Sequence, residues 1–484
     1  MASLKKNFAY NMFYQILTIA LPLITAPYVS RILGAEGVGV YSYTYSVANY
    51  FMFFAMLGIS NHGNRSIASA VKSKHELSKC FINNYCIQLC SGIIAALSYI
   101  FYITVFPVEN RSCAIIQGLV VVSGILDINW FFWGLEEFKL TVVRNTVCKL
   151  ASLICIFLFV RSRDDLWIYV LIMSSTALLS QLLLWRFLVK RIELQKPSCQ
   201  EIKVNIRPVI ILFLPILAYS LYRVTDKIMI GAFSTMIEVG YYDNAEKILN
   251  IPIGIITALG NVMLPRISNL LSEGNIKAQT RYIKLSFLFV SLVEGSLCFG
   301  IAAVSDVFVP LYYGDEFVQT SWILEILIFT ALISGWANVI RTQYLIPTRK
   351  DNIYVISMLV AAAINFVLNW IFIPEYGAMG ALIGTVSAEL IILFIQMISV
   401  RNEFKWHSLI SENIFYIISG VIMCGVVRFI GNIVNVGSLL KLVIEVVVGV
   451  VVYFLLAFTV CNVRKDDLYF LIKSFFNKVK NKMA

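Results

Sequence analysis

Long apolar stretches dominate this 484-residue chain, and short polar segments separate them. A helix needs about 20 apolar residues to cross roughly 30 Å of hydrocarbon. With Pro, Gly, Asn and charged clusters taken as boundaries, fourteen windows of suitable length emerge. The pattern therefore predicts an all-α integral membrane protein of about 14 transmembrane helices. The windows lie near 9–30, 41–62, 81–104, 113–134, 144–160, 167–189, 208–230, 242–264, 283–304, 320–340, 353–373, 379–400, 412–432 and 440–462.

Composition agrees with this pattern and excludes several classes of protein. Hydrophobic residues make up 59% of the chain and charged residues 14%, against roughly a quarter charged in soluble domains. The net charge of +11 is scattered between apolar windows, which indicates membrane orientation rather than nucleic-acid binding. None of the ten cysteines forms a CxxC pair, so we expect no metal site and no cofactor.

The loop charges predict the orientation, because Lys and Arg are retained on the cytoplasmic side. With a cytoplasmic N-terminus, 29 of the 39 basic residues fall on that side, 6 on the other and 4 within spans. Arg144 is counted among the cytoplasmic loop residues. An even number of spans also makes the C-terminus cytoplasmic, and we expect 463–484 to form a basic amphipathic tail along the membrane surface.

Two short matches indicate an internal repeat. LPLI (21–24) resembles LPIL (214–217), and VGVYS (38–42) resembles VGYYD (239–243), at offsets of 193 and 201. Six predicted spans separate the copies, so the halves share one orientation about a pseudo-twofold axis. We expect an N-lobe at 1–207, a C-lobe at 208–405 and two additional helices at 406–462.

Basic residues within or at the ends of spans are the best candidates for a site, because charge at membrane depth is costly. Arg31 closes the first predicted span, Arg223 and Lys227 lie one helical turn apart in the seventh, and Lys247 lies in the eighth. If these spans line a cleft, the four groups would suit a phosphate. The structural alternative is pairing, with Asp226 for Arg223 and Asp243 for Lys247, or snorkelling of the long side chains.

Four acidic residues within the predicted spans are also candidates for a functional role. Asp226 shares the face of Arg223, whereas the other three stand alone in the fourth, ninth and twelfth spans. They could couple transport to H⁺ or Na⁺, or remain protonated and hydrogen-bonded as structural groups. The three lone acids are Asp127, Glu294 and Glu389.

Five segments give the chain a resemblance to a known family. They are RILGAEGVGVY (31–41), WFFWGLEEF (130–138), LYYGDEF (311–317), TQYLIP (342–347) and PEYGAMG (374–380). The chain resembles the polysaccharide transporters, the Wzx-type flippases of O-antigen and capsule repeat units. Their superfamily also holds multidrug and toxic compound extruders and lipid II flippases. The similarity extends over residues 1–462.

The resemblance implies two six-helix lobes around a cavity, two further helices, and alternating access in a bacterial inner or plasma membrane. The implied cargo is an undecaprenyl-diphosphate-linked oligosaccharide, with the diphosphate at the basic residues. Membrane lipids and, in the same pathway, a polysaccharide polymerase and chain-length machinery are the implied partners. Four tyrosines are candidates for stacking on sugars, although packing is the commoner role of such residues: Tyr28, Tyr45, Tyr219 and Tyr222.

Two competing functions remain open at this point. A membrane polysaccharide polymerase would need a large outer loop or clustered carboxylates, and no outer loop exceeds roughly fifteen residues, so we expect no enzyme. A cation-coupled multidrug antiporter of the related extruder family would line its cavity with carboxylates. The intramembrane candidates here are mostly Arg and Lys, which favours the flippase.

Overall fold

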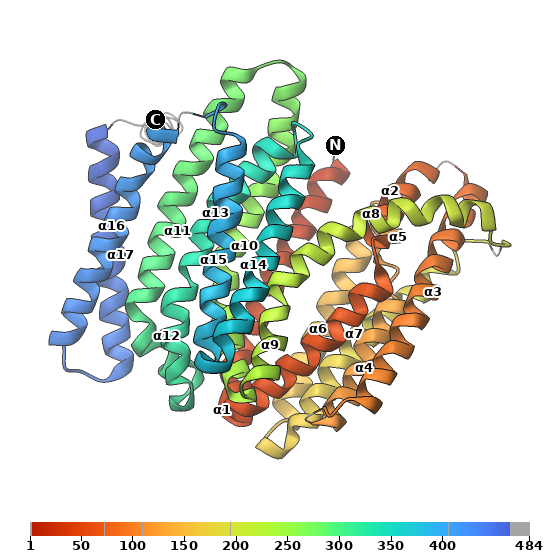
Figure 1. The fold of residues 1–484 in the computed structure, drawn as a ribbon, viewed down its shortest axis with the longest axis horizontal. Helices are drawn as coiled ribbons and strands as arrows, with labels where there is room; N and C mark the ends of the chain where they lie inside the picture. The colour runs from red at the N-terminus through yellow and green to blue at the C-terminus, as the bar shows by residue number, and fades with distance from the viewer. Residues whose placement is uncertain (1, 72, 109, 194, 405, 465–484) are drawn as a thin grey trace. The chain divides into compact units, whose positions relative to one another are not determined.

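The computed structural model describes residues 2–71, 73–108, 110–193, 195–404 and 406–464. Side chains are described from residue 17 onward, with those of Ile19, Tyr219 and Tyr222 left out. Throughout this part of the chain the elements are helices, and no strand occurs (Figure 1). The all-α class predicted from the apolar windows is confirmed. The predicted tail at 463–484 lies almost entirely outside the described residues.

The first helix, α1 (Ala2–Met56), corrects the predicted boundary between the first two spans. A loop was expected between residues 30 and 41, yet only Gly34 departs from helical geometry there, with φ 69° and ψ 178°. Glycine adopts a positive φ without the penalty that a Cβ would impose. The chain therefore kinks at one residue where a loop of about ten was predicted.

Eight further helices follow up to residue 233. A one-residue joint at Val224 separates the last two, and a short 3₁₀ turn, Arg163–Asp165, precedes α7. In the views of Figure 1, α3, α4, α6 and α7 run alongside one another. The helices are α2 (Ile59–Ala70), α3 (Lys74–Val105), α4 (Arg111–Ile125), α5 (Asn129–Gly134), α6 (Phe138–Phe159), α7 (Leu166–Leu188), α8 (Cys199–Arg223) and α9 (Thr225–Phe233).

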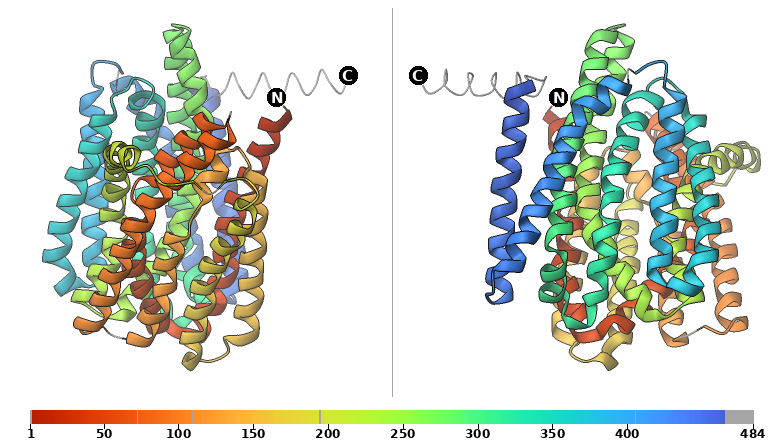
Figure 2. Two further views of the ribbon diagram at one scale, coloured as in Figure 1. Left: turned by 90° about the vertical axis from the view of Figure 1, so that its right-hand side faces the viewer. Right: turned by 60° about the vertical axis from the view of Figure 1, so that its left-hand side comes forward.

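The remaining eight helices are on average longer. A 3₁₀ turn, Asp315–Phe317, precedes α12, and a π-helical turn, Arg341–Leu345, follows α13. The last two helices lie beside each other and against α11 (Figure 2). The helices are α10 (Met236–Ser272), α11 (Ile276–Tyr313), α12 (Val318–Leu327), α13 (Phe329–Ile340), α14 (Asp351–Tyr376), α15 (Ala378–Ser399), α16 (Trp406–Ile433) and α17 (Ser438–Arg464).

Eleven helical segments of the described chain are long and apolar enough to cross a membrane. They correspond one to one with eleven of the fourteen predicted windows. The other three windows, 9–30, 41–62 and 208–230, fall on α1 with the start of α2, and on α8 with α9. Many large apolar side chains on the spanning helices are exposed, as a lipid-facing surface requires.

Contacts divide the chain into two compact units. The first holds residues 1–243 and 369–378, and the second holds 244–368 and 379–484. The core of the first unit contains the fully buried Trp130, Phe131 and Phe132. The second unit has one core around Phe287 and another around Tyr416. The lobe bounds expected from the repeat, 1–207, 208–405 and 406–462, stay predictions.

Candidate functional site

The two copies of the second repeat segment pack against each other within the first unit. A Cβ on Gly39 would lie 1.6 Å from the backbone oxygen of Met236, and one on Gly240 would lie 2.1 Å from that of Ala35. Both values are far below any real contact, so each helix approaches the other through a bare backbone. Gly39 and Gly240 are equivalent positions of the repeat, and each faces the other copy. Such a reciprocal contact is typical of a twofold relation.

A buried polar cluster lies one turn beyond this crossing. Ser42 donates to Asp243 Oδ1 over 2.6 Å, and these two residues are also equivalent positions of the repeat. The Lys227 Nζ lies 3.2 Å from the same oxygen, with its side chain 16% exposed and that of Asp243 10%. The ion pair therefore joins α9 to α10 and, through Ser42, to α1. Sequence reasoning had considered Asp243 as a partner of Lys247, and the structure adds Lys227.

Aromatic rings flank this cluster on α1 and α7. Tyr41 stacks on Tyr45, with ring centroids 5.8 Å apart, and meets Tyr169 edge-on at 4.7 Å. Tyr45 is 37% exposed, whereas the side chains of Tyr219 and Tyr222 are not among those described. Tyr28 has a bonded hydroxyl instead, which donates to the Val160 carbonyl over 2.8 Å and ties α1 to the end of α6.

Asp226 accepts hydrogen bonds from two neutral side chains. Tyr242 donates to its Oδ2 over 2.9 Å, and the Asn369 amide donates to its Oδ1 over 2.6 Å. The carboxyl group is 1% exposed. These bonds link α9, α10 and α14.

The four basic candidates are divided between the two units. Arg31, Arg223 and Lys227 belong to the first unit and Lys247 to the second. Arg31 is exposed three residues before the kink at Gly34, and Arg223 is half-buried at the end of α8. Lys247 donates to Asn244 Oδ1 over 3.0 Å. Convergence of all four on one cleft stays a prediction.

A second buried polar network surrounds Asp127 in the first unit. Its Oδ1 accepts from the backbone and side-chain nitrogens of Asn129, both at 2.8 Å, and its Oδ2 accepts from Gln181 over 3.2 Å. Arg144 donates to Asn129 Oδ1 over 2.7 Å and to Ser180 on α7. The network connects the α4–α5 junction with α6 and α7, so Asp127 is embedded in hydrogen bonds.

Arg144 does not lie where the sequence predicts it. It was counted with the cytoplasmic loops, whereas it is 7% exposed within α6. The helix begins at Phe138, six residues before the predicted window, because the segment FKLTVV is itself apolar and helical. That apolar run was the available signal. Lys149 was counted with the same loop and also lies within α6, and moving both residues leaves the charge bias of the remaining loops intact.

The WFFWG segment that carried part of the family resemblance forms buried structure. Its Trp130 donates to Gln88 Oε1 over 3.0 Å, and the Gln88 amide donates to the carbonyls of Gly124 and Asp127, each at 2.8 Å. These carbonyls lie where α4 ends inside the protein. Gln88 therefore satisfies backbone groups that a broken membrane helix would otherwise leave without partners.

The two remaining acids lie buried in the second unit. Glu294 on α11 is 1% exposed, and its Oε1 has no hydrogen-bond partner among the described residues. Glu389 on α15 is 2% exposed. In the described chain no group of three or more His, Cys, Asp or Glu side chains is placed to hold a metal ion.

A family model described as "Polysaccharide biosynthesis protein" matches residues 4–271, which is more than half of the chain. This chain belongs to the polysaccharide biosynthesis protein family. The resemblance predicted from the five segments is confirmed, and the chain is a multi-pass membrane protein of that family. Its matched region holds every residue of the Ser42, Lys227 and Asp243 cluster.

The similarity to two curated relatives extends over most of this chain. The "Putative O-antigen transporter" of Escherichia coli (strain K12) is 23% identical over 408 residues, which cover 83% of this chain and 97% of that protein. The protein of the same name from Shigella dysenteriae is 22% identical over 402 residues, covering 82% and 100%.

Solved structures place the fold among known transporters. The lipid II flippase MurJ in an inward closed conformation matches with a TM-score of 0.72 and 16% identity, over 95% of this chain and 99% of MurJ. An inward-facing multidrug transporter of the MATE family matches with a TM-score of 0.55 and 14% identity, over 76% and 93%. At these identities the likeness concerns the fold alone.

Proposed function

We propose that this protein is a flippase for undecaprenyl-diphosphate-linked oligosaccharide repeat units of an O-antigen or capsule type. It moves them from the cytoplasmic to the outer leaflet of a bacterial inner membrane, with both of its termini in the cytoplasm. The observation that carries the proposal is the family membership together with similarity to the "Putative O-antigen transporter" of Escherichia coli over 83% of this chain and 97% of that protein.

The physical problem for such a protein is the headgroup. Sugars and phosphates cannot enter hydrocarbon without losing their hydrogen bonds to water, at a cost of several kcal/mol per group. A transporter must therefore offer polar and cationic groups at membrane depth. The cluster of Ser42, Lys227 and Asp243 supplies such groups at the crossing of the two repeat segments.

In this proposal Arg223 and Lys227 attract the diphosphate. Asp243 neutralises Lys227 at 3.2 Å, so a buried lysine is not left unpaired. An arriving diphosphate competes with Asp243 for the ammonium group, and Asp243 keeps the Ser42 hydroxyl as a donor. Tyr45, which is partly exposed, is the candidate for contact with a sugar. The energy source would be a gradient of H⁺ or Na⁺, with Glu294 as the candidate acid.

The experiment measures outer-leaflet accessibility of undecaprenyl-diphosphate-linked oligosaccharide in vesicles that contain the purified protein. Wild type is compared with Arg223→Ala and with the charge-keeping Arg223→Lys. We expect strong loss of translocation in Arg223→Ala and partial retention in Arg223→Lys, because a phosphate accepts either cation.

Folding controls distinguish loss of diphosphate binding from loss of folding. Insertion and thermal stability of each variant are measured alongside, and Arg401→Ala in the α15–α16 turn serves as a matched control with an exposed arginine. Wild-type activity in a well-inserted Arg223→Ala protein would refute the diphosphate role of Arg223. Absence of translocation by wild type, with efflux of organic cations in its place, would favour the multidrug antiporter.

A further inference from the structure

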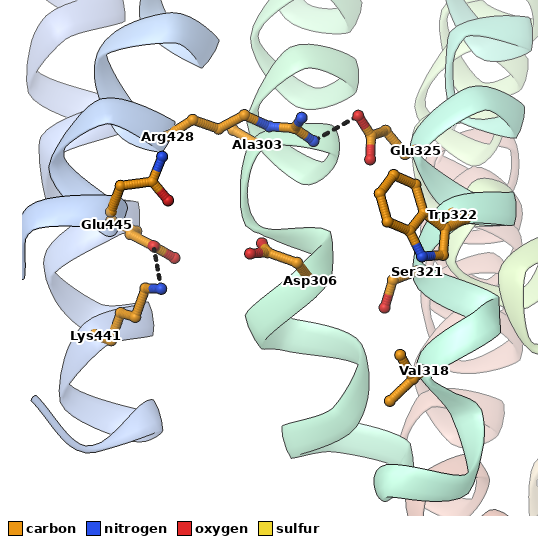
Figure 3. Close-up of a pocket in the computed structure, with 11 residues that line it drawn as sticks. Ala303, Asp306, Val318, Ser321, Trp322, Glu325, Arg428, Lys441 and Glu445 are labelled. Carbon is orange, nitrogen blue, oxygen red and sulfur yellow. Dashed lines mark ion pairs between the residues drawn. The ribbon is translucent and has the colours of Figure 1, made fainter. Parts of the chain in front are cut away.

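The second unit contains a charged cavity that the proposed transport site does not use. Its volume is about 330 Å³, and α11, α12, α16 and α17 line it (Figure 3). Three acids, Asp306, Glu325 and Glu445, face two bases, Arg428 and Lys441. One water molecule needs only about 15 Å³ of such volume, so the cavity has room for a polar headgroup.

The ion pairs in this cavity leave two carboxyl groups that can accept further hydrogen bonds. Arg428 binds Glu325 at 2.6 Å, and Lys441 lies 3.9 Å from Glu445 Oε1. Asp306 makes no hydrogen bond or ion pair with any described residue. Glu445 is 3% exposed, and its Oε2 has no hydrogen-bond partner in the described chain.

These two carboxyl groups point toward each other across the cavity, one from α11 and one from α17 (Figure 3). A buried carboxylate oxygen without a donor is costly, so the site is incomplete without a further donor group. A compact cation that donates several hydrogen bonds would complete it. The described chain offers no set of ligands for a metal ion, which favours an ammonium group.

The cavity lies near the ends of helices that line it, where the headgroup region of a bilayer would fall. Lys441 is three residues from the start of α17, Arg428 five from the end of α16, and Asp306 seven from the end of α11. At 1.5 Å per residue these positions are roughly 5 to 10 Å from the helix ends. The neighbouring Trp322 is 60% exposed, as is common for aromatic residues at the membrane interface.

An apolar groove of about 520 Å³ begins where the cavity ends. Glu445 lines both, and the groove continues along α11 and α17 past Val304 and Leu292 to Ala457. The twelve residues from Glu445 to Ala457 span about 18 Å of helix, which is close to the roughly 15 Å hydrocarbon depth of one leaflet. Cavity and groove together have the shape of a polar head followed by one acyl chain.

We propose that the cavity and groove bind one phospholipid of the zwitterionic, primary-amine class, such as phosphatidylethanolamine. Its ammonium group lies between Asp306 and Glu445, its phosphate lies beside Arg428, and one acyl chain occupies the groove. The lipid belongs to the leaflet at the α16–α17 turn. A primary ammonium donates three hydrogen bonds, whereas the trimethylated group of phosphatidylcholine donates none, so the site discriminates between them.

The test counts bound lipids by native mass spectrometry. Purified full-length protein in detergent is titrated with phosphatidylethanolamine and, separately, with phosphatidylcholine of the same acyl chains. We expect a preference of about tenfold for phosphatidylethanolamine, which is the size of about one hydrogen bond to a charged group. Asp306→Asn with Glu445→Gln should abolish the preference.

Two control variants separate the effect of the cavity from general effects of the substitutions. Asp351→Asn with Glu273→Gln makes the same chemical changes at exposed positions outside the cavity and should retain the preference. Asp306→Asn alone changes an exposed residue, so it should fold and lower the preference. Equal binding of the two lipids by wild type, or a preference that survives in the double variant, would overturn the proposal.

A third lipid separates this inference from the transport function. Undecaprenyl diphosphate is added to protein loaded with phosphatidylethanolamine. Binding without displacement leaves the two sites distinct, as expected. One-for-one displacement would assign the groove to the transported lipid and overturn the inference, whereas loss of translocation alone would not bear on it.

Discussion

The close crossing of α1 and α10 predicts a large effect for a single methyl group. In Gly39→Ala the new Cβ would lie 1.6 Å from the Met236 oxygen, and real Cβ atoms essentially never come within 3.0 Å of such an atom. The two backbones must therefore separate by about 1.4 Å. Backbone oxygens cannot rotate away as a flexible side chain can, so the strain spreads along both helices.

The magnitude follows from overpacking. Added methyl groups in packed interiors cost about 1–3 kcal/mol, and this contact lies at or above the upper end because backbone must move. Separation would also lengthen the Ser42 to Asp243 hydrogen bond, now 2.6 Å, which is worth about 1.5–3 kcal/mol because its acceptor is charged. We expect Gly39→Ala to destabilise the protein by roughly 3 kcal/mol or more.

The assay is the apparent unfolding temperature of purified protein in detergent, followed by size-exclusion chromatography after heating. Gly425→Ala in α16 is the matched control, since a Cβ there meets nothing within 4 Å. Replacing a helical glycine by alanine with no clash should stabilise by up to about 1 kcal/mol. Equal unfolding temperatures for Gly39→Ala and Gly425→Ala would refute the inferred crossing.

Two further predictions concern the buried networks of the first unit. Arg144→Gln should destabilise the protein by roughly 3 kcal/mol and lower its unfolding temperature, because it removes a buried charged donor from Asn129 and Ser180. Arg401→Gln changes an exposed arginine, and an equal decrease in the two variants would contradict this prediction. Gln88→Leu keeps much of the volume but leaves the carbonyls at the end of α4 without donors, so we expect about 1–3 kcal/mol of destabilisation in the same assay; a value within 0.5 kcal/mol of wild type would contradict it.

Much of the fold follows from the sequence alone. Apolar windows predict fourteen spans, and eleven of them correspond to helices of the described chain that are long and apolar enough to cross a membrane. They can be predicted because the hydrocarbon thickness sets the helix length that an apolar stretch must reach. The match of 38–42 with 239–243 was a weak signal by itself. The structure places Gly39 against the backbone of the other copy and Ser42 against Asp243.

Partners and local bends required the tertiary structure. Composition could not show that the kink in α1 is confined to Gly34, because glycine is common both at helix kinks and in loops. Nor could it show that Arg144 lies inside α6, or that Asp226 binds Tyr242 and Asn369.

The cavity at Asp306 and Glu445 was likewise invisible in the sequence, because its acids come from separate helices. Whether a segment forms a membrane-spanning helix depends on its own hydrophobicity, which can be read from the sequence of that segment alone. The partner of a buried charge depends on which distant segment packs beside it, and only the folded chain decides that.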